Sequence, residues 1–144
     1  NFLTQPFAAK IVIILALLWR WTGYNMVFFL SGLQNIEYSV YEAAKIDGAS
    51  AIQTFFKITV PLLKPTILLT AIMSTNGTLQ LFDESINLTD GGPANASISM
   101  SHYIYNLCFK YVPNFGYAAA MSFFILLLVA VLALIQMRVG DKRD

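Results

Sequence analysis

The sequence predicts an all-α polytopic membrane protein with three transmembrane helices and one polar helical hairpin. Of its 144 residues, 57% are hydrophobic and 12% are charged, whereas soluble domains carry about 25% charged residues. Three stretches reach the roughly 20 mostly apolar residues that a helix needs to cross a bilayer. The net charge of +1 comes without a basic patch that could follow phosphates, so we expect no nucleic-acid partner.

The three predicted spans differ in how polar they are. Arg20 and Asn25 interrupt the first span, the second becomes polar toward its end, and the third contains no charged residue. A hairpin at about 38–60 and a loop at about 83–116 connect them. The spans cover about residues 7–33, 61–82 and 117–137.

Lysine and arginine near the span ends predict the orientation, because these residues accumulate on the cytoplasmic side. Two basic residues, Lys10 and Lys110, lie on one side of the predicted membrane. Six lie on the other side, around the hairpin and the C-terminal tail: Lys45, Lys57, Lys64, Arg138, Lys142 and Arg143. We therefore expect the hairpin and the C-terminus in the cytoplasm, and the 83–116 loop outside.

The hairpin is predicted from helix start and stop signals. Ser39 and Glu42 have the S-x-x-E spacing of a capping box, in which each side chain bonds to the other residue's backbone N–H. The first helix should then cover about 40–47 and stop at Gly48, which tolerates the left-handed conformation that ends helices. A second S-x-x-Q signal follows at 50–53.

That second signal predicts another helix over about 51–59, ending before Pro61. Its apolar residues recur at helical spacing and give it one hydrophobic face: Ile52, Phe55 and Phe56. Small residues should let another protein approach the backbone closely. Asp47 lies near the negative end of the first helix and needs a positive partner.

These residues carry a resemblance. Glu42-Ala43-Ala44, Gly48 and Ile58-Thr59-Val60-Pro61 resemble the EAA loop of ABC importer permeases, EAA-x3-G-x9-I-x-L-P, with Val60 in place of Leu. GLQNI at 32–36, LTDGGP at 88–93 and FGYAAA at 115–120 are similar to the maltose-type sugar permease family. The family often has proline where Glu37 stands. The resemblance covers nearly the whole chain and matches the C-terminal half of a six-helix type I permease core.

The resemblance implies a mechanism in which the hairpin seats in a cleft of an ATPase subunit and transmits its motion. It assigns this coupling to Glu42, Ala43, Ala44, Asp47, Gly48, Ile58 and Pro61. ATP and Mg would bind to the partner ATPase, with no cofactor in this chain. The other implied partners are a second permease, an extracytoplasmic solute-binding protein, membrane lipid and a sugar. From the residues alone, Glu42 could simply cap a helix and Gly48 simply end one.

A candidate solute path lies where the first two spans are polar. Ionisable residues inside a span are costly and suggest function, and Arg20 lies about 15 Å along the helix from Lys10. Aromatic, hydroxyl and amide groups suit a sugar, and the predicted path residues are Arg20, Trp21, Tyr24, Ser74, Gly77, Thr78 and Leu81. Alternatively, Arg20 pairs with a carboxylate on a missing helix, and Ser74 and Gly77 only allow tight helix packing.

The outer loop offers weaker signals. Asp83 and Glu84 could dock a binding protein, although ordinary solvated charges are the commoner case. Residues 97–111 could form a helix that lies flat at the membrane surface. His102 lacks a second ligand at metal-site spacing, and Cys108 has no basic neighbour that would activate it.

Four hypotheses about function arise from these observations. The first is a permease subunit of an ATP-driven ABC importer for a sugar or oligosaccharide, located in a bacterial or archaeal inner membrane. The alternatives are a structural membrane assembly subunit, or a permease of the same family for another solute such as glycerol phosphate. An intramembrane enzyme would need paired ionisable groups at one depth, and only Arg20 lies deep in a predicted span. The sequence contains no phosphate-binding G-x-x-x-x-G-K-[ST] loop, so we expect another chain to bind ATP. The chain does not begin with methionine, and we expect three further spans elsewhere.

Overall fold

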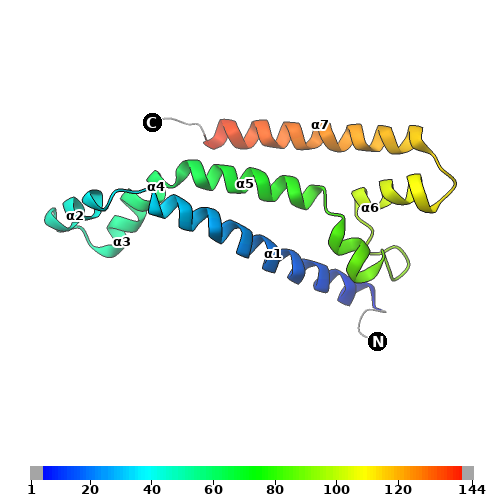
Figure 1. Cartoon of the computed structure of the whole chain (residues 1–144), viewed down its shortest axis with the longest axis horizontal. Helices are drawn as coiled ribbons and strands as arrows, with labels where there is room; N and C mark the ends of the chain where they lie inside the picture. The colour runs from blue at the N-terminus through cyan, green and yellow to red at the C-terminus, as the bar shows by residue number, and fades with distance from the viewer. Residues whose placement is uncertain (1–4, 141–144) are drawn as a thin grey trace.

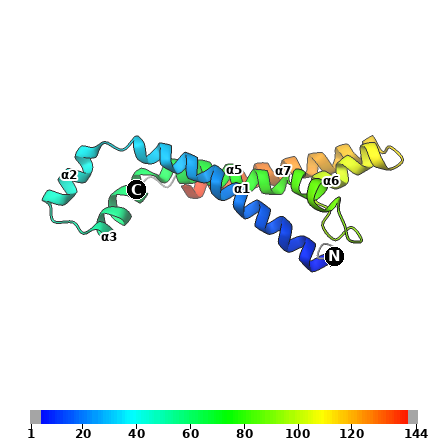
Figure 2. The same cartoon turned by 60° about the horizontal axis from the view of Figure 1, so that its bottom comes forward.

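The computed structural model describes residues 5–140, which form helices joined by turns and short loops, as the predicted all-α fold requires. Three long helices run side by side: α1 (Pro6–Gln34), α5 (Lys64–Leu79) and α7 (Phe115–Gly140). α5 lies in the middle and contacts both of the others (Figure 1). The hairpin projects from one end of this bundle, and the loop that follows α5 lies at the other end (Figure 2).

α1 and α7 are each long and apolar enough to cross a membrane, and they cover the ranges of the first and third predicted spans. α1 has 29 residues with a proline in its first turn, where the missing N–H breaks no helical bond. α7 has 26 residues. Most of its large side chains, such as Phe123, Leu127 and Leu134, are exposed in this chain. Exposure of that kind suits a helix surrounded by lipid or by other membrane helices.

The middle helix is shorter than the predicted span over 61–82. α5 begins at Lys64 and ends at Leu79, and the chain before it is bent by 64° at Leu63. The preceding arm consists of α3 (Ala51–Thr54), the π-helix η2 (Phe55–Thr59) and α4 (Val60–Leu62). The prediction that the helix ends before Pro61 is wrong, because Pro61 lies in the first turn of α4. α4 continues directly from the π-helix η2, so the helical run passes through the proline and ends at Leu62.

The loop after α5 contains further helix rather than extended chain. The π-helix η3 (Ser85–Thr89) is followed by a turn and then by α6 (Met100–Tyr105) and the π-helix η4 (Asn106–Lys110). α6 and η4 pack along the first half of α7. The helix expected over 97–111 is thus two successive segments that cover a neighbouring helix.

Candidate functional site

α1 and α5 cross closely because glycines remove side chains at two contact points. A Cβ on Gly32 would lie 2.8 Å from Cδ2 of Leu63 and 2.9 Å from Oγ1 of Thr66. A Cβ on Gly77 would overlap ring atoms of Trp21. Gly77 therefore allows tight helix packing, which is the alternative that the sequence left open for it. It also sets the position of the Trp21 indole.

Between these two contacts, polar side chains face each other across the helix pair. The Asn25 amide donates to Oγ of Ser74 at 3.0 Å, and Oγ of Ser74 lies 3.2 Å from Oδ1 of Asn25. The pair is partly buried. Ser74 thus has a defined partner, and the pair holds an amide and a hydroxyl in fixed orientation.

A groove of about 490 Å³ opens beside this pair. Its polar side chains come from both helices, and leucine and isoleucine side chains of α1 complete its wall. The indole Nε1 of Trp21 is buried and has no hydrogen-bond partner within residues 5–140. The groove residues that can offer hydrogen bonds are Trp21, Thr22, Asn25, Ser74 and Thr78.

The predicted path residues fall into two sets. Trp21, Ser74 and Thr78 line the groove, and Gly77 lies behind Trp21. Tyr24 stacks edge-on against Trp21 with ring centroids 5.4 Å apart, and its hydroxyl lies 3.8 Å from the Met73 sulfur. Leu81 follows the end of α5 and is not among the groove residues.

Arg20 lies halfway along α1 and forms an ion pair within this chain. Its Nη1 donates to Oε1 of Glu84 at 2.8 Å and lies 3.9 Å from Oδ2 of Asp83. The Glu84 side chain is 10% exposed, whereas that of Asp83 is 69% exposed. The expectation of solvated charges is therefore wrong for Glu84, because its carboxylate is buried and pairs with Arg20. The carboxylate that pairs with Arg20 thus lies in this chain, in the loop that follows α5, and not on a missing helix.

The hairpin that begins with α2 (Tyr38–Ile46) turns on Gly48, as predicted. Gly48 has φ +73°, the left-handed region where a Cβ is costly. Its N–H bonds to the carbonyl of Lys45, and the N–H of Ala49 bonds to that of Ala44. These two bonds form a Schellman motif, which closes the end of α2 and fixes the direction in which the chain leaves it.

The two predicted capping boxes have different outcomes. At the start of α3, Ser50 Oγ accepts from the N–H of Gln53, and Gln53 Oε1 accepts from the N–H of Ser50, which confirms the second box. The first box is wrong. α2 begins two residues earlier than that box requires, Glu37 is the N-cap, and Ser39 donates to the Glu37 carboxylate instead.

The predicted coupling residues mostly lie on the surface of the hairpin. Glu42, Ala43, Asp47 and Gly48 are exposed, whereas Ala44 is buried and Ile58 is partly buried. Several apolar side chains of the hairpin are also exposed in this chain: Ile46, Ile52, Phe55 and Phe56. The hairpin therefore presents small, acidic and apolar groups together at one end of the molecule.

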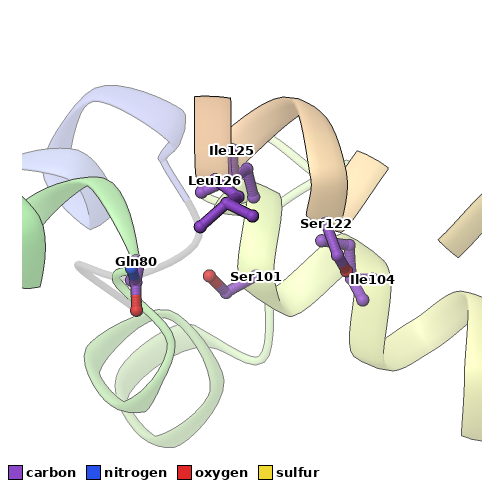
Figure 3. A pocket seen from close by; sticks show the side chains of 6 residues that line it. All are labelled: Gln80, Ser101, Ile104, Ser122, Ile125 and Leu126. Atoms are coloured by element: carbon purple, nitrogen blue, oxygen red, sulfur yellow. The ribbon is translucent and has the colours of Figure 1, made fainter. Parts of the chain in front are cut away.

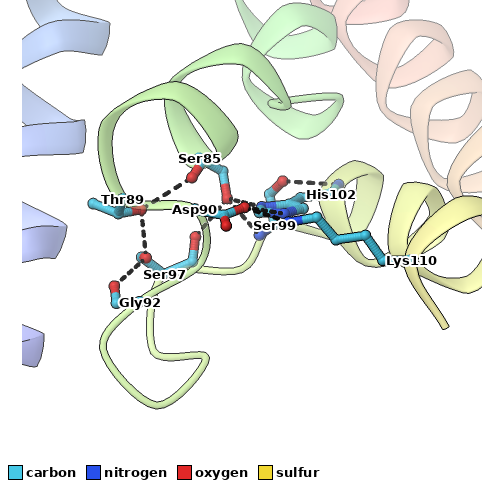
Figure 4. A network of polar contacts seen from close by, with 8 residues as sticks. All are labelled: Ser85, Thr89, Asp90, Gly92, Ser97, Ser99, His102 and Lys110. Atoms are coloured by element: carbon cyan, nitrogen blue, oxygen red, sulfur yellow. Dashed lines mark hydrogen bonds and ion pairs between the residues drawn. The ribbon is translucent and has the colours of Figure 1, made fainter.

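The 83–116 loop, which we call the outer loop after its predicted side of the membrane, is held by a buried polar network that the sequence did not predict (Figure 4). Ser85 and His102 are both 0% exposed. Ser85 Oγ donates to the Ser97 carbonyl at 2.7 Å and lies 2.8 Å from His102 Nδ1. Because a hydroxyl has one proton and the carbonyl takes it, His102 Nδ1–H must donate to Ser85 Oγ. Oδ1 of Asp90 lies 3.8 Å from His102 Nε2 and accepts from Lys110 at 2.6 Å.

This network contains serine, histidine and aspartate, yet its geometry is structural. A nucleophilic serine gives its proton to the histidine, whereas Ser85 gives its proton to a carbonyl and is sealed from solvent. Burial lowers the pKa of His102 below its ordinary 6.5, although the charge of Asp90 opposes this change. The hydrogen bond from Lys110 holds the pKa of Asp90 below 3.8.

A second hollow, of about 370 Å³, lies on the other side of α5. Gln80 and Ser101 face it from α5's end and from α6, and α7 contributes Ser122, Ile125 and Leu126 (Figure 3). The Ser122 hydroxyl is already bonded to the Ala118 carbonyl. This hollow offers fewer fixed polar groups than the groove between α1 and α5.

Comparison with known families decides what kind of protein carries these features. Residues 1–143 match the family described as "Binding-protein-dependent transport system inner membrane component". The chain belongs to this family. It is thus an inner-membrane transport component rather than an enzyme, as the resemblance implied.

Several relatives of this transport component have named substrates. The chain is 56% identical to the lactose transport system permease protein LacF of Rhizobium radiobacter, over 99% of the chain and 49% of the relative. It is 36% identical to the trehalose/maltose permease protein MalF of Thermococcus litoralis, over 99% of the chain and 48% of the relative. The chain therefore spans about half the length of these relatives.

A solved structure supports the fold of the transport component. It is the crystal structure of a bacterial ABC transporter involved in the import of the acidic polysaccharide alginate. The TM-score is 0.81 at 26% identity, over 98% of this chain and 49% of the other. The helix arrangement described above is therefore that of an ABC importer permease.

Sequence reasoning missed two long-range contacts in this transport component, Arg20 with Glu84 and Ser85 with His102. Glu84 could have been paired with Arg20 only by knowing that the chain turns back toward α1 after α5. The Ser85 and His102 pair also gave no local signal, because seventeen residues separate them. Both contacts depend on how α5 and the loop lie in space.

Proposed function

We propose that this chain forms part of the translocation path for a sugar or oligosaccharide in an ATP-driven importer. The groove between α1 and α5 carries the proposal, because it combines the apolar face of Trp21 with the amide and hydroxyls of Asn25, Ser74 and Thr78. Sugars have apolar faces and hydroxyl rims, so they fit walls of this composition. The named substrates of LacF and MalF, lactose and trehalose or maltose, agree with this assignment.

The proposal extends to how ATP hydrolysis drives transport. The hairpin at 38–60 would face the cytoplasm and seat on an ATPase subunit, with Glu42, Ala43, Asp47 and Gly48 at its surface. The Schellman motif at Gly48 and the capping box at Ser50 support this role because they stiffen the turn between two helical arms. A stiff turn can transmit displacement from a partner to α5. The 83–116 loop would then face the extracytoplasmic solute-binding protein, and a second permease would complete the path.

ATP-driven uptake tests the coupling role. The double variant Glu42→Ala with Gly48→Pro should leave ATP hydrolysis in proteoliposomes that contain the complete importer, but abolish sugar uptake. Ser39→Ala is the matched control, since Ser39 caps no helix end in this structure. Normal uptake by the double variant would contradict the coupling assignment.

The groove is tested by removing one hydroxyl. Thr78→Val keeps the shape of an exposed groove residue and should weaken the apparent affinity for a transported sugar about five- to tenfold. Ser122→Ala removes a hydroxyl from the other hollow and should leave the affinity unchanged. Equal effects of the two variants would argue against the groove as the sugar path.

A further inference from the structure

A charged cluster of Arg20, Asp83 and Glu84 lies next to the groove between α1 and α5, although none of the three residues lines it. Arg20 lies beside the groove residue Trp21, with its Cζ 5.8 Å from the centre of the indole ring. The guanidinium donates to Glu84 Oε1 at 2.8 Å, and Asp83 lies 3.9 Å away. The Arg20 side chain is 54% exposed, so the rest of its guanidinium remains accessible.

The burial of the two carboxylates differs sharply. Glu84 is nine-tenths buried, and its Oε2 has no hydrogen-bond partner within the part of the chain that the structure describes. Asp83 is largely exposed, and its contact with Arg20 is too long for a hydrogen bond. A buried carboxylate keeps nearly its full field, whereas an exposed one is screened by water and salt. Glu84 is therefore the carboxylate that sets the field around Arg20.

The charges of the cluster leave no spare positive charge. Arg20 contributes one positive charge, and Asp83 and Glu84 contribute one negative charge each, so the net charge is −1. Lys10 lies ten residues away on the same helix, or about 15 Å. Lys110 is bonded to Asp90 in the outer loop. A negatively charged solute would therefore meet an arginine that is already neutralised and a carboxylate in excess.

We propose that Glu84 is a specificity-determining residue that makes this path select neutral saccharides against those with a carboxylate. The proposal rests on the proposed function and names its substrate class. The hydroxyl groups of a neutral saccharide can accept hydrogen bonds from the remaining N–H groups of Arg20, and they carry no charge that Glu84 would repel. A uronic acid would be repelled by Glu84 and would meet an arginine whose positive charge Glu84 already offsets. Glu84 thus acts by occupying Arg20.

The test compares two neighbouring carboxylates. Glu84→Gln and Asp83→Asn each replace one carboxylate by an amide of the same shape, but only Glu84 is buried and hydrogen-bonded to Arg20. The probes are lactose and the same disaccharide with the galactose C6 oxidised to a carboxylate. Binding is measured by saturation-transfer NMR on the complete importer in nanodiscs, without solute-binding protein, so that the permease alone selects.

The wild-type importer should bind lactose about tenfold more tightly than the acidic disaccharide. Glu84→Gln should reduce this preference to near unity, whereas Asp83→Asn should change it less than about twofold because its charge is screened. An unchanged preference in Glu84→Gln, with lactose still bound, would overturn the proposal. If the wild type binds neither sugar, the proposed function is contradicted, and so is the inference that rests on it.

A second variant covers the case in which Glu84→Gln does not fold. Arg20→Gln removes the cation and leaves both carboxylates, so the preference for lactose over the acidic disaccharide should increase. Chromatography of each variant in detergent checks that the assembled importer is intact. An unchanged or smaller preference in Arg20→Gln would overturn the proposal, because the two remaining carboxylates would then not repel the acidic disaccharide.

Discussion

The hairpin and the outer loop hold their shapes in different ways. In the hairpin, the deciding bonds join residues three to five apart, such as Gly48 to Lys45 and Gln53 to Ser50. In the outer loop, Ser85 bonds to residues twelve and seventeen positions away. The hairpin side chains are largely exposed, whereas Ser85 and His102 are fully buried. The hairpin is therefore stiffened by local hydrogen bonds and needs no surrounding core. The outer loop is instead held by buried hydrogen bonds between residues far apart in the sequence.

Ser85→Ala should have the largest effect, because it breaks the long-range network at its centre. The change leaves the His102 ring and the Ser97 carbonyl buried without their partner, which costs about 1–3 kcal/mol for each unsatisfied group. Hydrogen exchange across residues 85–110 should therefore accelerate strongly, with little change in the hairpin. Protection that stays at the wild-type level would show that the network does not hold the loop.

Gly48→Ala should have the next largest effect, and it should be confined to the hairpin. The position has φ +73°, and a non-glycine residue there costs about 1–2 kcal/mol. Nothing lies within 4 Å of the added Cβ, so the penalty is conformational rather than steric. Faster exchange at the amides of 44–54, with the outer loop unchanged, is the expected result. A response in the outer loop would contradict the independence of the two regions.

A pair of serine variants sharpens the account of the hairpin. Ser50→Ala removes a capping box and should cost about 1 kcal/mol of local stability, whereas Ser39→Ala should cost close to nothing. The same substitution in the same hairpin thus separates a capping serine from one that only contacts Glu37. Amide exchange at Gln53 and at Glu42 measures the two effects. Equal losses of stability in the two variants would indicate that Ser39 also caps a helix, as the first predicted capping box requires.

The smallest expected effect is a pH dependence that only the outer loop shows. The pKa of His102 is lowered in the folded loop by burial, so an unfolded loop binds a proton more readily. The stabilisation is complete above about pH 6.5 and falls as the pH drops from there through the lowered pKa of His102. The pKa of Asp90 is also lowered, so its own contribution is lost only below about pH 3.8.

Exchange rates measured between pH 7.5 and 5 check this dependence. After correction for intrinsic exchange, amides of the outer loop should lose protection as the pH falls, and those of the hairpin should not. His102→Gln should abolish the difference between the two regions. A loop that gains protection at low pH would mean that the attraction of Asp90 for protonated His102 exceeds the cost of burial.

The same contrast explains what the sequence could predict. The left-handed Gly48 and the capping box at Ser50 follow from residues within a few positions of each other, so local chemistry was sufficient. The local prediction also failed once, because the N-cap of α2 is Glu37 and not Ser39, two residues further on. The Arg20–Glu84 pair and the Ser85–His102 network needed the direction of the chain after α5. That direction depends on packing between α1, α5 and α7.

The bend at Leu63 has a mechanical consequence. The arm from Ala51 to Leu62 meets α5 at 64°, and Leu63 at the corner is buried against Gly32 of α1. A displacement along the arm would therefore rotate α5 about Leu63 more than it would shift α5 along its own axis. Ser74 and Thr78 lie on α5 and form one wall of the groove, so the width of the groove would change when α5 rotates.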